Sequence, residues 1–281
     1  MVSFPPAKLN IGLHILDRRE DGYHNLESIF LPIGWTDILE VTVNENMPRG
    51  EASFTWTGLN IPGEENSNLV VRAHQLMAKD YDFPGLSFHL HKALPMGAGL
   101  GGGSADGTHA LRAINDLCNL AIPHEKMTAL AAELGSDCPF FLQDGPAFIS
   151  GRGEIVTPLK HSLNCHGFWV VVANPGIHVG TADAFSGVTP MPRTTDWQSL
   201  ENQPVNSWSD LVKNDFEPSI AQRHPEVQTL LDMMKGNGAS YTQMTGSGST
   251  VFGLFEDQSS ATETANQCSA GYCGRIEFPH C

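Results

Sequence analysis

Five of the seven residues from Gly97 to Gly103 are glycines, and this run leads directly into a segment with helical character, residues 104–120. Glycine lets the backbone adopt positive φ and approach an anion closely, and the first amides of a helix have no partner within the helix. A simple turn seldom needs more than one or two glycines. The segment therefore predicts a phosphate-binding loop at a helix start, with Ser104 either capping the helix or turning its hydroxyl toward a metal ion on the phosphates.

Gly97, Gly99 and Gly102 also fit the dinucleotide fingerprint GxGxxG, but the flanking sequence does not. That fingerprint follows a buried parallel strand and leads through one helix to a second strand. Residues 86–91 instead alternate apolar and polar side chains, typical of an antiparallel strand with one wet face. A second helical stretch stands where the next strand should be. A Walker A loop needs Lys before the Ser or Thr, and Gly103 is followed by Ser104 alone. The sequence thus predicts a phosphate loop of a third kind.

Composition limits the partners of this chain. Its 281 residues carry a net charge of -15, which argues against nucleic acid or an anionic membrane surface, since both are polyanions. A bound polyphosphate must then be neutralised locally by amides, a few lysines and a divalent metal. We find no signal peptide and no apolar run long enough to span a bilayer. We expect a soluble, cytoplasmic protein that acts on a small molecule as a monomer or homodimer.

The six cysteines form no CxxC pair. Four residues near the end of the sequence, Cys268, Cys273, His280 and Cys281, could in principle hold a metal. Their spacing matches no common zinc template. We therefore expect reduced thiols and no structural metal.

Strand-like and helix-like segments are interleaved along the chain, with local hairpins such as the turn at Asp21 and Gly22. This order favours an α+β fold. We expect two domains, residues 1–160 and 161–281, and an exposed loop over residues 189–204, which are rich in Pro, Thr and Gln. Expected strands cover residues 9–16, 24–33, 37–43, 86–91, 168–173, 250–255 and 274–278, and expected helices 68–79, 104–120, 124–134, 225–235 and 259–268.

A second glycine cluster lies in residues 244–255, within a turn that leads into a strand. By itself it indicates either a hairpin with close backbone packing or a second contribution to a ligand site. The sequence alone leaves both readings open.

Two charged residues stand out as candidates for phosphoryl transfer, which needs an electrostatic clamp and often a carboxylate base. Lys8 lies among apolar residues in a chain with few cations, although most lysines are surface residues. Asp137 precedes four apolar residues and is either the cap of a short helix or a site residue. Spacing alone cannot pair them.

Several motifs together resemble those of the superfamily of galactokinase, homoserine kinase, mevalonate kinase and phosphomevalonate kinase. They are PAKLN (6–10), DGYH (21–24), PMGAGLGGGSA (95–105), LGSDCPFF (134–141) and TGSGST (245–250). The pair PAKLN and DGYH is similar to the family that phosphorylates the 2-hydroxyl of 4-diphosphocytidyl-2-C-methyl-D-erythritol in non-mevalonate isoprenoid synthesis. A mevalonate or homoserine kinase, or a catalytically silent nucleotide-binding relative, are the alternatives. DGYH argues against the former, and the presence of both Lys8 and Asp137 against the latter.

The resemblance implies a fold and a set of site residues. The fold is an N-terminal domain like the second domain of ribosomal protein S5 and a ferredoxin-like C-terminal domain, with ATP and substrate between them. Asp137 would be the base toward the substrate hydroxyl and Lys8 would orient that hydroxyl, with Asn10 nearby. Tyr23 and His24 would contact the cytidine and Phe185 its other face. The residues implied for ATP, with Mg2+ alongside and Ser104 near the metal, are Pro95, Met96, Gly97, Ala98, Gly99, Leu100, Gly101, Gly102, Gly103, Ser104 and Ala105.

Two features depart from the superfamily pattern. After Ser104, relatives tend to have alanines, whereas this chain has Asp106 and Gly107. Glycine inside a helix costs roughly 1 kcal/mol against alanine, so we expect a looser helix start. Residues 183–204 have no clear counterpart, which leaves substrate contacts from that region undefined.

Overall fold

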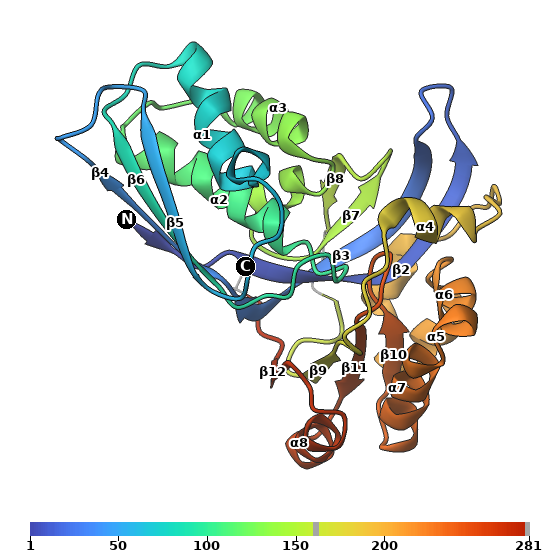
Figure 1. Cartoon of the computed structure of the whole chain (residues 1–281). Coiled ribbons are helices and arrows are strands. Elements are labelled where there is room, and N and C mark those ends of the chain that lie inside the picture. Colours follow the sequence, from blue (N-terminus) through green and yellow to red (C-terminus); the bar gives the residue numbers. More distant parts are fainter. Residues whose placement is uncertain (160–162, 279–281) are drawn as a thin grey trace. The chain divides into compact units, whose positions relative to one another are not determined.

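The computed structural model describes residues 1–159 and 163–278 (Figure 1). Contacts divide the chain into two compact units, each built from separated segments. Unit 1 comprises Met1–Ala7, Thr36–Met96 and Gly101–Asp144, and unit 2 comprises Lys8–Trp35, Gly97–Leu100 and Gly145–Cys281. The glycine loop is shared, because residues 97–100 count with unit 2 and residues from Gly101 onward with unit 1.

Unit 1 is a four-stranded sheet with helices on one face (Figure 1). The strand order is β1-β4-β6-β5, and all neighbours are antiparallel except β5 and β6. Its elements are β1 (Val2–Ser3), β4 (Ile38–Val43), β5 (Ala52–Gly58), η1 (Glu65–Ser67), α1 (Leu69–Asp80), β6 (Leu86–Lys92), α2 (Gly102–Leu117), α3 (His124–Leu134) and η2 (Cys138–Leu142), where η marks a 3-10 helix.

The alternation in β6 explains how this sheet and its helices are held together. Leu86, Phe88 and Leu90 are buried and pack in one core with apolar residues of α1, α2 and α3. The side chains between them face the opposite side, where His89 is bonded to Thr55 and Thr57 of β5. The expected wet face is confirmed. The expected antiparallel setting holds for β4 only, because β5 adds to the other edge in parallel.

Unit 2 contains two antiparallel sheets. The first has the order β2-β3-β7-β8, and the second the order β10-β11-β9-β12. The second sheet, with α6 and α7 between β9 and β10 and α8 between β11 and β12, is the ferredoxin-like βαββαβ arrangement that the resemblance implied. The strands are β2 (Pro6–Arg18), β3 (His24–Thr36), β7 (Ala147–Ser150), β8 (Ile155–Pro158), β9 (Trp169–Ala173), β10 (Tyr241–Met244), β11 (Val251–Phe255) and β12 (Tyr272–Arg275).

The helices of unit 2 cover one face of the ferredoxin-like sheet. Apolar residues of α7 and α8 share a core with Val171, Val251 and Phe255. These three positions lie on the same side of β9 and β11, as the register Val251↔Ala173 and Gly253↔Val171 requires. The helical elements are α4 (Thr181–Ser186), η3 (Trp197–Asn202), η4 (Val205–Ser207), α5 (Trp208–Leu211), α6 (Glu217–Arg223), α7 (Pro225–Gly236) and α8 (Gln258–Gln267).

The α+β class is confirmed, and most expected elements are present. The helix expected at 104–120 instead spans Gly102–Leu117, because Gly101 in the left-handed region ends the loop and Cys118 caps the other end. The strand expected at 274–278 is β12, Tyr272–Arg275, whose register is set by pairing with Val172 through Trp169 of β9.

Residues 189–204 are the expected exposed loop only in part, because η3 within them buries Trp197, Leu200 and Glu201. Trp197 is 5% exposed, and its indole donates to Glu27 Oε2 at 2.6 Å. Gly12 of β2 makes room for it, since a Cβ at Gly12 would lie 2.9 Å from the Trp197 ring. The Met191 amide donates to the Ile15 carbonyl at 3.0 Å. This segment therefore packs on β2 through Trp197, a buried residue that the Pro-rich composition did not predict.

The same segment buries His14 of β2, which is 4% exposed and bonded to Thr195 Oγ1 at 3.0 Å. Burial, and then the nearby Arg193, lowers the pKa of His14 from 6.5 to about 4. The folded protein thus keeps His14 neutral while the unfolded chain binds a proton below pH 6.5, so stability falls as pH drops from 6.5 toward 4. We expect His14 to account for a loss on the order of 3 kcal/mol over that range.

Urea unfolding at pH 7 and pH 4.5 checks this prediction. The His14→Asn variant should lose less unfolding free energy on acidification than the wild type, whereas the exposed His124→Asn variant should behave like the wild type. Equal acid sensitivity of the wild type and His14→Asn would contradict the role of His14.

No helix among the described residues is long and apolar enough to cross a membrane. Cys118, Cys138, Cys165, Cys268 and Cys273 are free thiols. The other two residues considered as metal ligands, His280 and Cys281, lie outside the described residues.

Candidate active site

The glycine loop leads into α2 through three left-handed glycines, Gly97 (φ 63°), Gly99 (φ 78°) and Gly101 (φ 71°). Gly101 is the N-cap of α2, so Ser104 is not the cap and lies instead in the first helical turn. The first amide to bond within the helix is that of Ala105, which donates to the Gly101 carbonyl at 3.0 Å. The amides before it are of the kind that bind an anion at a helix start.

Lys8 is buried, although most lysines in proteins lie at the surface. It is 3% exposed, its ammonium donates to Asn10 Oδ1 at 2.6 Å, and it lies 4.4 Å from the centre of the Phe30 ring. The Lys8 amide donates to the Leu100 carbonyl at 2.9 Å. The PAKLN motif is therefore bonded directly to the glycine loop within unit 2.

Asn10 connects Lys8 to the terminal glycine cluster. The backbone amide of Asn10 donates to Thr245 Oγ1 at 3.0 Å, and the side-chain Nδ2 donates to Ser28 Oγ at 3.0 Å. Thr245 Oγ1 in turn donates to Asn10 Oδ1 at 3.2 Å. Both Thr245 and Ser28 are fully buried. Because the Asn10 side chain is itself fixed by Ser28 and Thr245, it holds the Lys8 ammonium in one position.

The two glycine clusters meet in unit 2. A Cβ at Gly99 would lie 2.2 Å from the Thr245 carbonyl oxygen, and one at Gly246 would lie 2.9 Å from the Gly99 Cα. The first reading of the second cluster, close backbone packing, is confirmed, and the backbone it packs against is that of the first glycine loop. His178 lies against the same loop, 2.8 Å from a Cβ placed at Gly97.

Asp137 stands at the start of η2 in unit 1. It is the N-cap residue by backbone position, but its side chain makes no capping hydrogen bond. The next residue, Cys138, is tied to α2 because its carbonyl accepts from Thr108 Oγ1 at 2.9 Å. Burial raises the pKa of the Cys138 thiol to about 11, and hydrogen bonds with Ser104 and Thr108 partly offset this. The fold therefore brings Asp137 beside the first two turns of α2.

A buried ion network under the α2 start is a feature that sequence analysis missed. Lys92 Nζ donates to Asp37 Oδ2 at 2.5 Å and to Asp106 Oδ2 at 2.7 Å. Burial raises the pKa of Asp106 to about 7, although the charge of Lys92 opposes the shift. The available signal was an aspartate inside a predicted helix, with a lysine at the end of the preceding strand. Gly107 is also explained, since a Cβ there would lie 2.8 Å from Leu69 Cβ of α1. The start of α2 is thus anchored and not loose.

The residues expected around cytidine gather at the β2–β3 hairpin in unit 2. Tyr23 is 53% exposed, and the Arg152 guanidinium lies 5.0 Å from the centre of its ring. The rings of His24 and Phe185 are stacked, with centres 4.5 Å apart and planes 16° apart. Burial lowers the pKa of His24, so at neutral pH its ring is neutral, the form that can both donate and accept a hydrogen bond. Phe185 of α4 therefore stacks on His24, one of the two residues expected to contact the cytidine.

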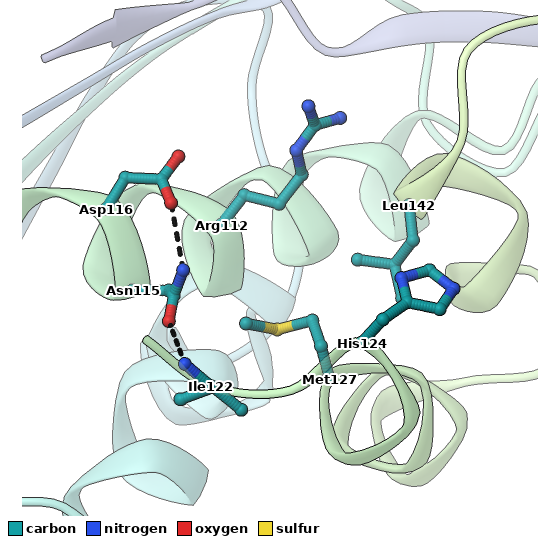
Figure 2. Close-up of a pocket in the computed structure, with 7 residues that line it drawn as sticks. All are labelled: Arg112, Asn115, Asp116, Ile122, His124, Met127 and Leu142. Atoms are coloured by element: carbon teal, nitrogen blue, oxygen red, sulfur yellow. Dashed lines mark hydrogen bonds between the residues drawn. The ribbon is translucent and has the colours of Figure 1, made fainter. Parts of the chain in front are cut away.

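A separate cavity of about 260 Å3 lies at the connection between α2 and α3 (Figure 2). Figure 2 shows Asn115 bonded both to Asp116 and to the Ile122 amide, so its polar groups are used in holding that connection. The described residues that line the cavity include none of the predicted site residues. They are Arg112, Asn115, Asp116, Ile122, His124, Met127 and Leu142.

Comparison with known proteins gives consistent matches over nearly the whole chain. Residues 68–152 match the family described as GHMP kinases N terminal domain, and residues 194–272 match GHMP kinases C terminal. A 4-diphosphocytidyl-2-C-methyl-D-erythritol kinase of Parabacteroides distasonis is 41% identical over 256 residues, 91% of this chain and 92% of the relative. One of Cytophaga hutchinsonii is 40% identical over 255 residues, with the same coverage.

Solved structures agree with these matches. A crystal structure of 4-(cytidine 5'-diphospho)-2C-methyl-D-erythritol kinase superposes with a TM-score of 0.81 at 29% identity, covering 99% of this chain and 100% of that one. A homoserine kinase from Cytophaga hutchinsonii superposes with a TM-score of 0.70 at 16% identity, covering 99% and 94%. The second likeness shows the fold alone.

Proposed function

Since the chain belongs to the 4-diphosphocytidyl-2-C-methyl-D-erythritol kinase family of the GHMP kinases, we propose that it transfers a phosphoryl group from ATP to the 2-hydroxyl of that compound. One observation carries the proposal. Lys8, Gly99 and Thr245 lie far apart in the sequence but are joined by short hydrogen bonds and backbone contact in unit 2. Such convergence on a glycine loop is what a phosphate clamp requires.

In the proposed mechanism the glycine loop and the first amides of α2 bind the phosphates of ATP. Lys8, held by Asn10, orients the acceptor oxygen and offsets the negative charge that develops during transfer. Asp137 accepts the proton of the 2-hydroxyl as the new phosphate bond forms.

Magnesium fits this arrangement only as a companion of ATP. Among the described residues, no group of three or more His, Cys, Asp or Glu could hold a metal ion. Mg2+ would therefore be held together with ATP, and Ser104 is the residue of the loop whose hydroxyl would help to hold it. When bound, it would neutralise phosphate charge in a protein of net charge -15.

Release of ADP by purified protein with Mg-ATP tests the proposal directly. The acceptors are 4-diphosphocytidyl-2-C-methyl-D-erythritol, mevalonate and homoserine. Release that depends on the cytidine compound alone is the expected result. Release with mevalonate or homoserine instead would reassign the acceptor within the superfamily, and ATP binding without turnover of any acceptor would favour a silent relative.

Tyr23 should contribute to binding of the cytidine substrate by stacking. The Tyr23→Ala variant is expected to raise the KM for that substrate by about 10- to 100-fold, because stacking on an aromatic ring is worth roughly 1–3 kcal/mol per base. The KM for ATP should stay within about threefold of the wild type, since its phosphates bind elsewhere. Steady-state kinetics with each substrate varied in turn measures both constants.

The Tyr23→Phe variant is the matched control, because it keeps the ring and removes only the hydroxyl. Its KM for the cytidine substrate should remain near the wild-type value. An unchanged KM in Tyr23→Ala would contradict stacking at this position.

The remaining parts of the proposal rest on sequence. We place the domain boundary near residue 160, with domains 1–160 and 161–281, and the two family matches lie on either side of it. Action in the cytoplasm as a monomer or homodimer is inferred from composition alone.

A further inference from the structure

The Lys92 network joins three separate segments of unit 1 by buried charges. Lys92 ends β6 and is 1% exposed, Asp37 lies between β3 and β4, and Asp106 lies in the second turn of α2. One ammonium donates to both carboxylates, at 2.5 and 2.7 Å. Breaking a buried pair leaves an uncompensated charge, so such a network fixes its members firmly.

The network holds the chain on the entry side of the glycine loop. Asp37 Oδ1 accepts from the Ala93 amide at 2.6 Å and from the Leu94 amide at 2.9 Å. These two residues directly precede the loop that begins at Pro95. The position of the loop entry is therefore set by Asp37, and through it by Lys92.

The network also holds the exit side of the loop. A Cβ at Gly102, the first residue of α2, would lie 3.1 Å from Lys92 Nζ. Asp106, one turn further along, accepts from the same ammonium. The residues before the loop and the first turns of α2 after it are therefore both held near one buried ammonium, that of Lys92.

Asp106 is the member of the network that belongs to α2. Its Oδ2 accepts from Lys92, and its Oδ1 has no hydrogen-bond partner among the described residues. Asp106 therefore ties α2 to Lys92.

We propose that Asp106 and Lys92 are positioning residues that fix the start of α2, and with it the loop amides, for the phosphates of ATP. This inference rests on the proposed function, because it assumes that ATP binds at this loop. The residues act through the backbone and need not touch the nucleotide. Their loss should therefore displace the amides without removing a catalytic group.

The test compares Asp106→Ala with Asp106→Asn in the full-length protein. Asp106→Ala should raise the KM for ATP by about tenfold while kcat and the KM for the acceptor change less than about threefold. Titration calorimetry with Mg-ADP should show the same loss of affinity without turnover. Asp106→Asn keeps an oxygen acceptor for Lys92 and should recover most of the affinity.

Asp116→Ala serves as the matched control, since Asp116 is an exposed aspartate in the last turn of the same helix. It should bind nucleotide like the wild type. Unchanged nucleotide affinity in Asp106→Ala would overturn the inference. A variant in which the KM for ATP, the KM for the acceptor and kcat all worsen equally, and in which the unfolding midpoint also falls, would overturn it too. That result would indicate a role in core stability only. Wild-type protein that fails to bind Mg-ADP or Mg-ATP would instead overturn the proposed function.

Discussion

Replacing Asp137 by asparagine is expected to lower kcat by about 10²- to 10⁴-fold, the usual contribution of a general base. Asparagine has nearly the same shape as aspartate but cannot accept the proton of the acceptor hydroxyl. The position is well anchored, because the neighbouring Cys138 carbonyl is bonded to Thr108 of α2 and the following residues are buried. The loss should therefore come from chemistry and not from movement of η2.

Two measurements separate these causes. Affinity for Mg-ADP by calorimetry should stay within about threefold of the wild type, since the proposed mechanism assigns phosphate binding to the loop amides and not to Asp137. Asp144→Asn, an exposed aspartate a few residues further on, should keep normal turnover. Normal kcat in Asp137→Asn would remove Asp137 as the base.

Substituting Gly99 by alanine should disrupt both the loop and the folded state of unit 2. The backbone there has a φ of 78°, and the added Cβ would lie 2.2 Å from the Thr245 carbonyl oxygen. Left-handed strain costs roughly 1–2 kcal/mol and forced overpacking roughly 1–3 kcal/mol more. We expect the free energy of unfolding to fall by about 3 kcal/mol, and nucleotide affinity to fall by at least about 100-fold as the loop is displaced.

Gly103→Ala provides the folding control in the same glycine run. A Cβ at Gly103 meets no atom within 4 Å, and the residue is inside α2. Alanine should stabilise the helix there by up to about 1 kcal/mol. If urea unfolding gives the same midpoint for both variants, the contact between Gly99 and Thr245 is not the constraint described here.

Sequence patterns predicted the elements that show a clear local signal, such as helical periodicity or a capping residue. The helix α3 spans His124–Leu134 as expected, and α1 begins after Asn68, whose side chain accepts from the Val70 amide as a cap. β5 was missed because it is an edge strand whose side chains are mostly exposed, so its sequence shows no buried alternation. The burial of part of residues 189–204 was missed because a polar, Pro-rich composition predicts exposure, whereas Trp197 is buried against β2.

Single residues of the candidate site could be predicted from motifs, but the hydrogen bonds and ion pairs between them could be seen only in the tertiary structure. Motifs gave Lys8, Asn10 and the glycine loop by position, but a buried lysine and a surface lysine look alike in a sequence. The bond from Asn10 to Thr245 spans 235 residues, and no local pattern encodes it. The ion network of Lys92 likewise joins residues 55 apart in sequence. Asp137 and Tyr23 keep the roles proposed for them until the variants are measured.

The contact of Gly99 with Thr245 has a consequence during protein synthesis. All segments of unit 1 have been made once Asp144 is added, whereas Thr245 follows Gly99 by 146 residues. At 5–20 residues per second the ribosome needs on the order of 10 s to cover that interval. For that time the glycine loop lacks Thr245, the residue against which Gly99 packs. A ligand that needs the packed form of this loop can therefore bind only near the end of translation.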